Sequence, residues 1–103
     1  MAREHLVWPT LQEMMLGTEP IFVSGATPYV FATGHAAYGL VCRIDDTQVT
    51  SITDVDGTTT TNKTWQNVAM KAGIDCIIFD IPVASITLNA AGSIALYPIK
   101  YQS

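Results

Sequence analysis

Residues 85–97 read SITLNAAGSIALY, and this stretch decides the fold class of the 103-residue chain. Apolar and polar side chains alternate on both sides of Asn89-Ala90-Ala91-Gly92, which is the period of a strand with one buried face. A turn composition between two alternating runs is typical of a β-hairpin. The segment therefore predicts a hairpin with strands at residues 85–89 and 93–97.

Similar runs extend N-terminally from this segment, and together they predict an all-β domain over residues 21–103. Their spacing, about 8–12 residues between turn signals, is typical of a sandwich or of a small, jelly-roll-like barrel. The run at 74–81 is almost continuously apolar, which predicts a strand buried on both faces. Pro82 and Pro98 lack a main-chain N–H, so we expect them at strand ends or at edge positions. The other runs span residues 28–33, 37–44, 48–55 and 65–70.

Residues 1–20 differ from this body and are predicted to form an N-terminal arm, part helical and part extended. The segment 9–17 has capping residues at both ends, which predicts a short helix. A helix of under two turns is unstable alone and must pack on other protein. It either closes one end of the domain's own core or reaches onto a neighbouring subunit. The predicted partner-binding residues of the arm are Trp8, Leu11, Met14 and Met15.

The composition excludes several classes of function. Hydrophobic residues make up 49% of the chain and charged residues 14%, against about 25% charged in an ordinary soluble domain. The net charge of −4 gives no basic surface for nucleic acid or for an anionic membrane. No apolar stretch approaches the roughly 18 residues of a membrane-spanning helix. A surface poor in charge is instead suited to being covered by other protein.

Residues that carry chemistry are few, and we predict no catalytic residue, cofactor or metal. His5 and His35 are the only histidines, and His35 follows a glycine at an expected turn. A hydrolytic triad would need His35 with Ser24 or an aspartate, and a small metal-dependent hydrolase would need His35 with nearby carboxylates. No sequence motif selects such a partner.

Two further groups of polar or reactive residues have a structural explanation. Asp54-Val55-Asp56-Gly57 is either a turn or half of a calcium-binding loop, and no acidic residue follows it at the spacing of a full loop. Cys42 and Cys76 each lie in an apolar run, so we expect buried free thiols rather than a disulfide.

The aromatic residues offer two kinds of binding surface. Tyr97 and Tyr101 lie on one face of the last predicted strand and are predicted to contact a partner. Trp65, at the start of an apolar run, is predicted to anchor the core or an interface. A carbohydrate-binding module that stacks sugars on Trp65, Tyr38 or Tyr29 is the alternative.

Residues 48–101 resemble a group of small virion proteins of tailed bacteriophages. The resemblance rests on Asp-Val-Asp-Gly at 54–57, a threonine-rich loop, TWQNV at 64–68, KAG at 71–73, FDIPVASITL at 79–88 and GSIALY at 92–97. It implies a non-enzymatic capsid decoration (cement) protein that is located in the virion and assembles in the host cytoplasm. Its partners would be the major capsid protein and further copies of itself, as a dimer or trimer. A head or tail spike or fibre-base subunit is the alternative.

Overall fold

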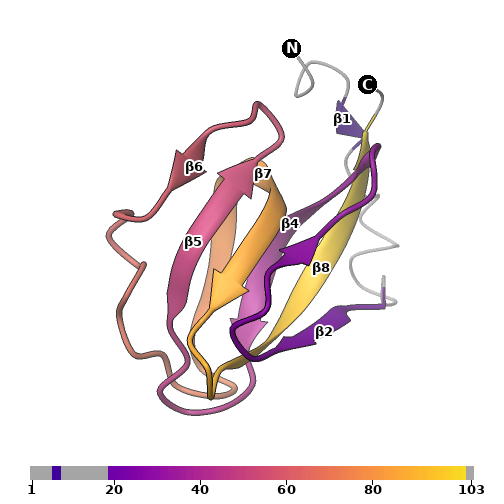
Figure 1. Cartoon of the computed structure of the whole chain (residues 1–103). Coiled ribbons are helices and arrows are strands. Elements are labelled where there is room, and N and C mark those ends of the chain that lie inside the picture. The colour runs from indigo at the N-terminus through magenta and orange to yellow at the C-terminus, as the bar shows by residue number, and fades with distance from the viewer. Residues whose placement is uncertain (1–5, 8–18, 102–103) are drawn as a thin grey trace.

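The computed structural model describes residues 6–7 and 19–101, and this part of the chain is all-β, as predicted (Figure 1). The helix predicted within the arm lies outside the described residues. The strands are β1 (Leu6–Val7), β2 (Ile21–Ser24), β3 (Tyr29–Val30), β4 (His35–Cys42), β5 (Val49–Asp54), β6 (Thr59–Thr60), β7 (Cys76–Leu88) and β8 (Ser93–Tyr101).

The strands pair antiparallel and form two layers that share the long strand β7. The main order is β1-β8-β4-β7-β5-β6, with β2 also paired to β8 and β3 also paired to β7. The first half of β7, residues 76–78, pairs with β4, whereas residues 83–88 pair with β5. One layer therefore contains β2, β8, β4 and the first half of β7, and the other contains β3, β5, β6 and the second half of β7. This arrangement is a small β-sandwich (Figure 1).

A bulge in the middle of β7 lets this strand serve both layers. Ala37 pairs with Val83 and Gly39 with Ile78, so residues 79–82 of β7 lie opposite the single residue Tyr38. The ladder is interrupted there, which is where a proline can enter a strand without losing a hydrogen bond. Pro82 occupies this position and is buried. The prediction of a strand end at Pro82 is wrong, because the bulge accommodates the proline inside the strand.

Pro98 also lies inside a strand, and on one side of it the described part of the chain supplies no paired residue. It pairs with Ala37 of β4 on one side. On the other side, β1 pairs with residues 100–101 of β8 and β2 with residues 93–96. Pro98 lies opposite the break between them, where no N–H is required. Within the described residues Pro98 therefore lies at a local edge of the sheet, which is one of its two predicted positions.

The predicted 85–97 hairpin is wrong, although both of its strands exist. β4 lies between β7 and β8 and pairs with each of them. The turn is formed as expected, with the Gly92 N–H donating to the Asn89 carbonyl at 3.0 Å. It carries the chain from one layer of the sandwich to the other. Alternation shows which side chains are buried but does not identify the partner strand. A hairpin of β7 with β8 and the pairing of both strands with β4 therefore have the same sequence pattern.

The run at 65–70 forms turns rather than the strand suggested by its composition. Its polar centre is Gln66, which is buried and satisfied at both ends of its amide. Gln66 Nε2 donates to the Thr60 carbonyl at 2.8 Å, and Gln66 Oε1 accepts from the Lys63 N–H at 3.0 Å. The Gln66 side chain, rather than pairing between strands, therefore holds this loop together.

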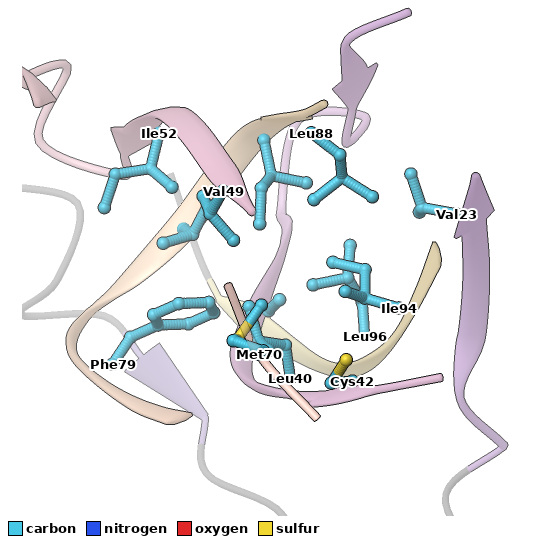
Figure 2. Packing of buried hydrophobic residues seen from close by; sticks show 13 residues of the cluster. Val23, Leu40, Cys42, Val49, Ile52, Met70, Phe79, Leu88, Ile94 and Leu96 are labelled. Carbon is cyan, nitrogen blue, oxygen red and sulfur yellow. The ribbon is translucent and has the colours of Figure 1, made fainter. Parts of the chain in front are cut away.

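The hydrophobic core fills the space between the two layers (Figure 2). Side chains from both layers point into it, including Val23 of β2, Val49 of β5 and Leu96 of β8. Trp65 packs against this core, with its ring centroid 5.7 Å from that of Phe79. Trp65 is therefore a core anchor, which is one of the two roles predicted for it.

Gly39 is required at the bulge because a side chain has no room there. A Cβ at this position would lie 2.9 Å from the Ile77 carbonyl oxygen and 3.0 Å from Ile78 Cδ1. We expect Gly39→Ala to lower the free energy of unfolding by about 1–3 kcal/mol, the usual cost of overpacking. The midpoint of urea unfolding measures this change. An unchanged midpoint would mean that β4 and β7 separate there without cost.

Candidate interaction surface

The solvent side of the layer that contains β2, β8, β4 and the first half of β7 is unusually apolar. We call it the outer face. The strand register places its side chains in two rows across the layer. The first row is Phe22, Ala95, Val41 and Cys76, and the second is Tyr97, Gly39 and Ile78. A solvent-facing side of an antiparallel sheet is ordinarily polar. These rows contain no charged residue.

Large apolar side chains on and beside this face are open to solvent. Ile78 is 71% exposed and Phe22 is 61% exposed. Ile74, which precedes β7 by two residues, is 73% exposed. The prediction that 74–81 forms a strand buried on both faces is therefore wrong, since Asp80 is exposed as well. Only one side of this run faces the core, because the described part of the chain forms no third layer.

The two cysteines lie on opposite sides of this layer. Both carry free thiols, as predicted. Cys42 is buried in the core, whereas Cys76 is exposed on the outer face, so the expectation that both are buried fails for Cys76. The register explains the difference, since Cys76 pairs with the outward residue Val41 and Cys42 alternates with it.

A tyrosine pair occupies the end of the outer face at the bulge. The rings of Tyr38 and Tyr97 lie 6.1 Å apart between centroids. Partial burial, and next the neighbouring Tyr97, raise the pKa of Tyr38, so this ring stays neutral well above physiological pH. The structure places Tyr97 on the outer face, where the sequence predicted a partner contact. The backbone of Tyr101 continues β8 opposite Leu6.

Charged groups lie at the margins of the outer face. The Arg43 guanidinium lies over the Phe22 ring, 4.1 Å from its centroid, and this contact holds the exposed ring in place. Lys63 Nζ donates to Asp80 Oδ2 at 3.2 Å. This hydrogen bond holds the pKa of Asp80 below its usual value. Because the pair is solvent-exposed, it adds little stability.

The histidine and serine considered for a hydrolytic site are far apart. His35 pairs with Lys100 of β8, and Ser24 pairs with Ser93 of the same strand. Positions 93 and 100 are seven residues apart, which is about 23 Å at 3.3 Å per residue. The Ser24 hydroxyl donates to Ser93 Oγ at 2.9 Å. The structure therefore does not bring Ser24 and His35 together.

The Asp54–Gly57 segment is a turn, the first of its two predicted explanations. Asp54 Oδ1 accepts from the Asp56 N–H at 2.9 Å and from the Thr58 N–H at 3.1 Å, and the turn joins β5 to β6. Within residues 19–101 and the short strand β1, no three His, Cys, Asp or Glu side chains are grouped to hold a metal ion.

The aromatic residues considered for sugar stacking each pack against another ring. Tyr29 packs against the core and against Phe31, whose ring centroid is 5.0 Å away. Trp65 packs on Phe79, and Tyr38 lies beside Tyr97. The three rings therefore lie in separate packing contacts, and the carbohydrate-binding alternative stays a prediction.

Four of the predicted partner-binding residues, Trp8, Leu11, Met14 and Met15, lie outside the described residues and stay predictions. The division into an arm at 1–20 and a domain at 21–103 stays a prediction as well. None of the segments that the structure describes is a helix with the length and hydropathy needed to cross a membrane.

The function has to be inferred from the sequence and the structure, because comparison with known proteins finds no match. No family model, no curated protein and no solved structure matches this chain. The fold and the outer face together describe a small β-sandwich with an apolar surface across four strands, bordered by charged groups.

Most of the outer face was not predicted from the sequence. Phe22, Val41 and Ile78 were not among the predicted partner-binding residues. A signal for the β7 part was present, since Ile74, Cys76 and Ile78 recur at every second position. It was hidden because Ile77 and Phe79, which face the core, make the run almost continuously apolar.

Proposed function

We propose that this chain is a capsid decoration (cement) protein of a tailed bacteriophage, bound to the major capsid protein through the outer face. The observation that carries the proposal is the pair of rows without a charged residue, one across four strands and one across three, with Ile78 and Phe22 largely exposed. The resemblance of residues 48–101 to small virion proteins supplies the class of partner.

The size of the exposed apolar surface supports binding to another protein. Ile74, Ile78 and Phe22 each expose more than half of their surface. Together they leave on the order of several hundred Å² of apolar area open, which is the size of the largest apolar patch on a typical soluble monomer, and such patches are often functional. Apolar cores surrounded by polar rims are typical of such sites. Arg43 and the Lys63–Asp80 pair provide polar groups at the margin.

A repeated lattice would strengthen modest contacts at this face. A shell presents many equivalent sites, so a decoration protein that binds through two or more copies gains avidity without any additional contact. Low charge suits this role, because neighbouring copies on a shell do not repel one another strongly. The paucity of charged residues in the chain, 14%, is consistent with it.

The test is co-sedimentation of the full chain with empty shells of the major capsid protein encoded alongside it. We expect the wild-type chain to bind and Ile78→Lys to lose at least about tenfold in affinity, because a lysine would have to be desolvated in the interface. Val30→Lys is the matched control, since Val30 is 68% exposed on β3 in the other layer. It should bind like the wild type.

Two outcomes would contradict the proposal. The first is absence of binding by a folded wild-type chain, and the second is equal binding by Ile78→Lys and the wild type. The number of copies per particle then separates the alternatives. Hundreds of copies are expected of a decoration protein, and a few copies of a spike or fibre-base subunit.

A further inference from the structure

The turn between β5 and β6 contains the one Asp-Gly pair of the chain, Asp56-Gly57. Because glycine has no side chain, its amide nitrogen is poorly shielded from the carboxyl group of the preceding aspartate. Every other aspartate of the chain is followed by a larger residue, and no asparagine is followed by glycine. Asp56-Gly57 is therefore the position at which a side chain reacts most readily with its own main chain.

The reaction at such a pair is isomerisation through a cyclic imide. The Gly57 nitrogen forms a bond to Cγ of the protonated Asp56 carboxyl group, and the carboxyl hydroxyl leaves with the amide proton as water. Water then opens the ring at one of its two carbonyls. Opening at one carbonyl restores Asp56, and opening at the other routes the main chain through Cβ, which is isoaspartate. Water is released and taken up again, so the mass is unchanged and no other reactant is needed.

Packing does not hinder this reaction in the folded chain. Asp56 and Gly57 are both exposed, so water reaches the carboxyl group and the amide. A Cβ at Gly57 would meet no atom within 4 Å apart from its chain neighbours. The space around the pair is therefore open, and the restraint on ring closure has to come from the hydrogen bonds of the turn.

The attacking nitrogen is held by one of these hydrogen bonds. The Gly57 N–H donates to the Asp54 carbonyl at 3.0 Å. The proton that the nitrogen must lose is the proton in this bond. The Val55 N–H donates to the Pro82 carbonyl at 3.0 Å, so the start of the turn is also fixed to β7.

The Asp54 carboxylate restrains the same peptide group from both sides. Its Oδ1 accepts from the Asp56 N–H at 2.9 Å and from the Thr58 N–H at 3.1 Å. These two N–H groups flank the Asp56–Gly57 peptide group. Ring closure requires rotation about the Cα–C bond of Asp56, which turns one of the two N–H groups away from Oδ1. The rotation therefore costs a hydrogen bond to a charged acceptor.

We propose that Asp56–Gly57 is a site of spontaneous isoaspartate formation, and that Asp54 is the positioning residue that slows the reaction in the folded protein. The inference goes beyond the proposed function, because it concerns the chemical lifetime of the chain. It is also independent of shell binding, since β5 and β6 belong to the layer opposite the outer face.

The experiment measures isoaspartate at residue 56 over time in the full chain at neutral pH. Peptide mapping locates the modified residue, and an isoaspartate-specific methyltransferase counts it. We expect residue 56 to be modified before any other aspartate, and at least about fivefold more slowly in the folded chain than in guanidinium chloride. Equal rates in the folded and unfolded chain would overturn the proposal, as would faster modification of another aspartate.

Variants assign the protection to the Asp54 side chain. We expect Asp54→Ala to raise the rate at least about fivefold, and Asp54→Asn, which keeps an oxygen acceptor, to recover most of the protection. Asp45→Ala is the matched control, because Asp45 Oδ1 also accepts a main-chain N–H, that of Ala72 at 2.9 Å, in another loop. It should leave the rate unchanged.

A second control separates the turn from global unfolding. Leu96→Ala removes a buried core side chain and does not touch the turn, so it should keep the wild-type rate. Circular dichroism checks that each variant is folded. A wild-type rate in folded Asp54→Ala, or equal acceleration by Leu96→Ala and Asp54→Ala, would refute the role of Asp54. The comparison of folded and unfolded wild type tests the proposal even where Asp54→Ala does not fold.

Discussion

Replacing Leu96 with alanine will lower the free energy of unfolding by about 3–4 kcal/mol, a large share of the 5–15 kcal/mol that stabilises a typical domain. Leu96 lies on β8, is fully buried and belongs to the core cluster between the layers (Figure 2). It is paired with Leu40 of β4, which is also buried. Removing its branched end leaves a cavity that the flanking strands, held by ladders, are unable to close.

Urea unfolding followed by tryptophan fluorescence measures this loss as a lower midpoint with an unchanged slope. Ile78→Ala is the control, because it removes a similar number of carbons from the same layer. Ile78 is 71% exposed, so this variant should change stability by no more than about 0.5 kcal/mol. If both variants cost the same, the outer face is already covered in the isolated chain, and its role as a free interaction surface fails.

Replacing Thr47 with valine will lower stability by about 2–3 kcal/mol, although the two side chains have nearly the same shape. Thr47 is completely buried. Its hydroxyl donates to the Ile44 carbonyl at 2.7 Å and accepts from the Ser93 N–H at 3.0 Å. Valine leaves the Ser93 N–H buried without a partner at the start of β8, and the cost is that of desolvating an unpaired donor.

Two variants distinguish this explanation from a loss of packing. Thr47→Ser keeps the hydroxyl and should recover much of the stability, whereas a packing effect would make serine the worse substitution. Thr53→Val is the same chemical change at an exposed site, where Thr53 Oγ1 lies 2.9 Å from Thr59 Oγ1. Its effect should stay within about 0.5 kcal/mol. The same urea titration compares all three.

The fold class was predictable because it depends on local patterns. Alternation at 85–88 and 93–97 predicts two strands with one buried face, and Ile86, Leu88, Ile94 and Leu96 are all buried. The Asp54–Gly57 turn was also predictable, since Asp54 bonds to the next residues of its own chain. The pairing of β7 and β8 with β4 was not predictable, because β4 lies far upstream and the 85–97 segment contains no signal that identifies it.

The candidate site was less predictable than the fold, for a geometric reason. Whether Ile78 contacts solvent or protein depends on how many layers the domain has, and composition does not determine this number. Phe22 was hidden in a segment of four residues, too short to show a period. Only Tyr97 was identified, because aromatic residues near a chain end are conspicuous without any knowledge of topology.

The position of β4 between β7 and β8 has a consequence for how the protein is made. β4 is complete by residue 42, yet both of its neighbours begin after residue 75. During synthesis β4 therefore leaves the ribosome with both of its edges unpaired, and its partner strands follow only after most of the chain has been made. Folding must close long loops before it gains these contacts, which is typical of slow-folding β-topologies. During that interval the nascent chain exposes apolar strands that can aggregate with other chains. Chaperones and low temperature should therefore favour recovery of the soluble product.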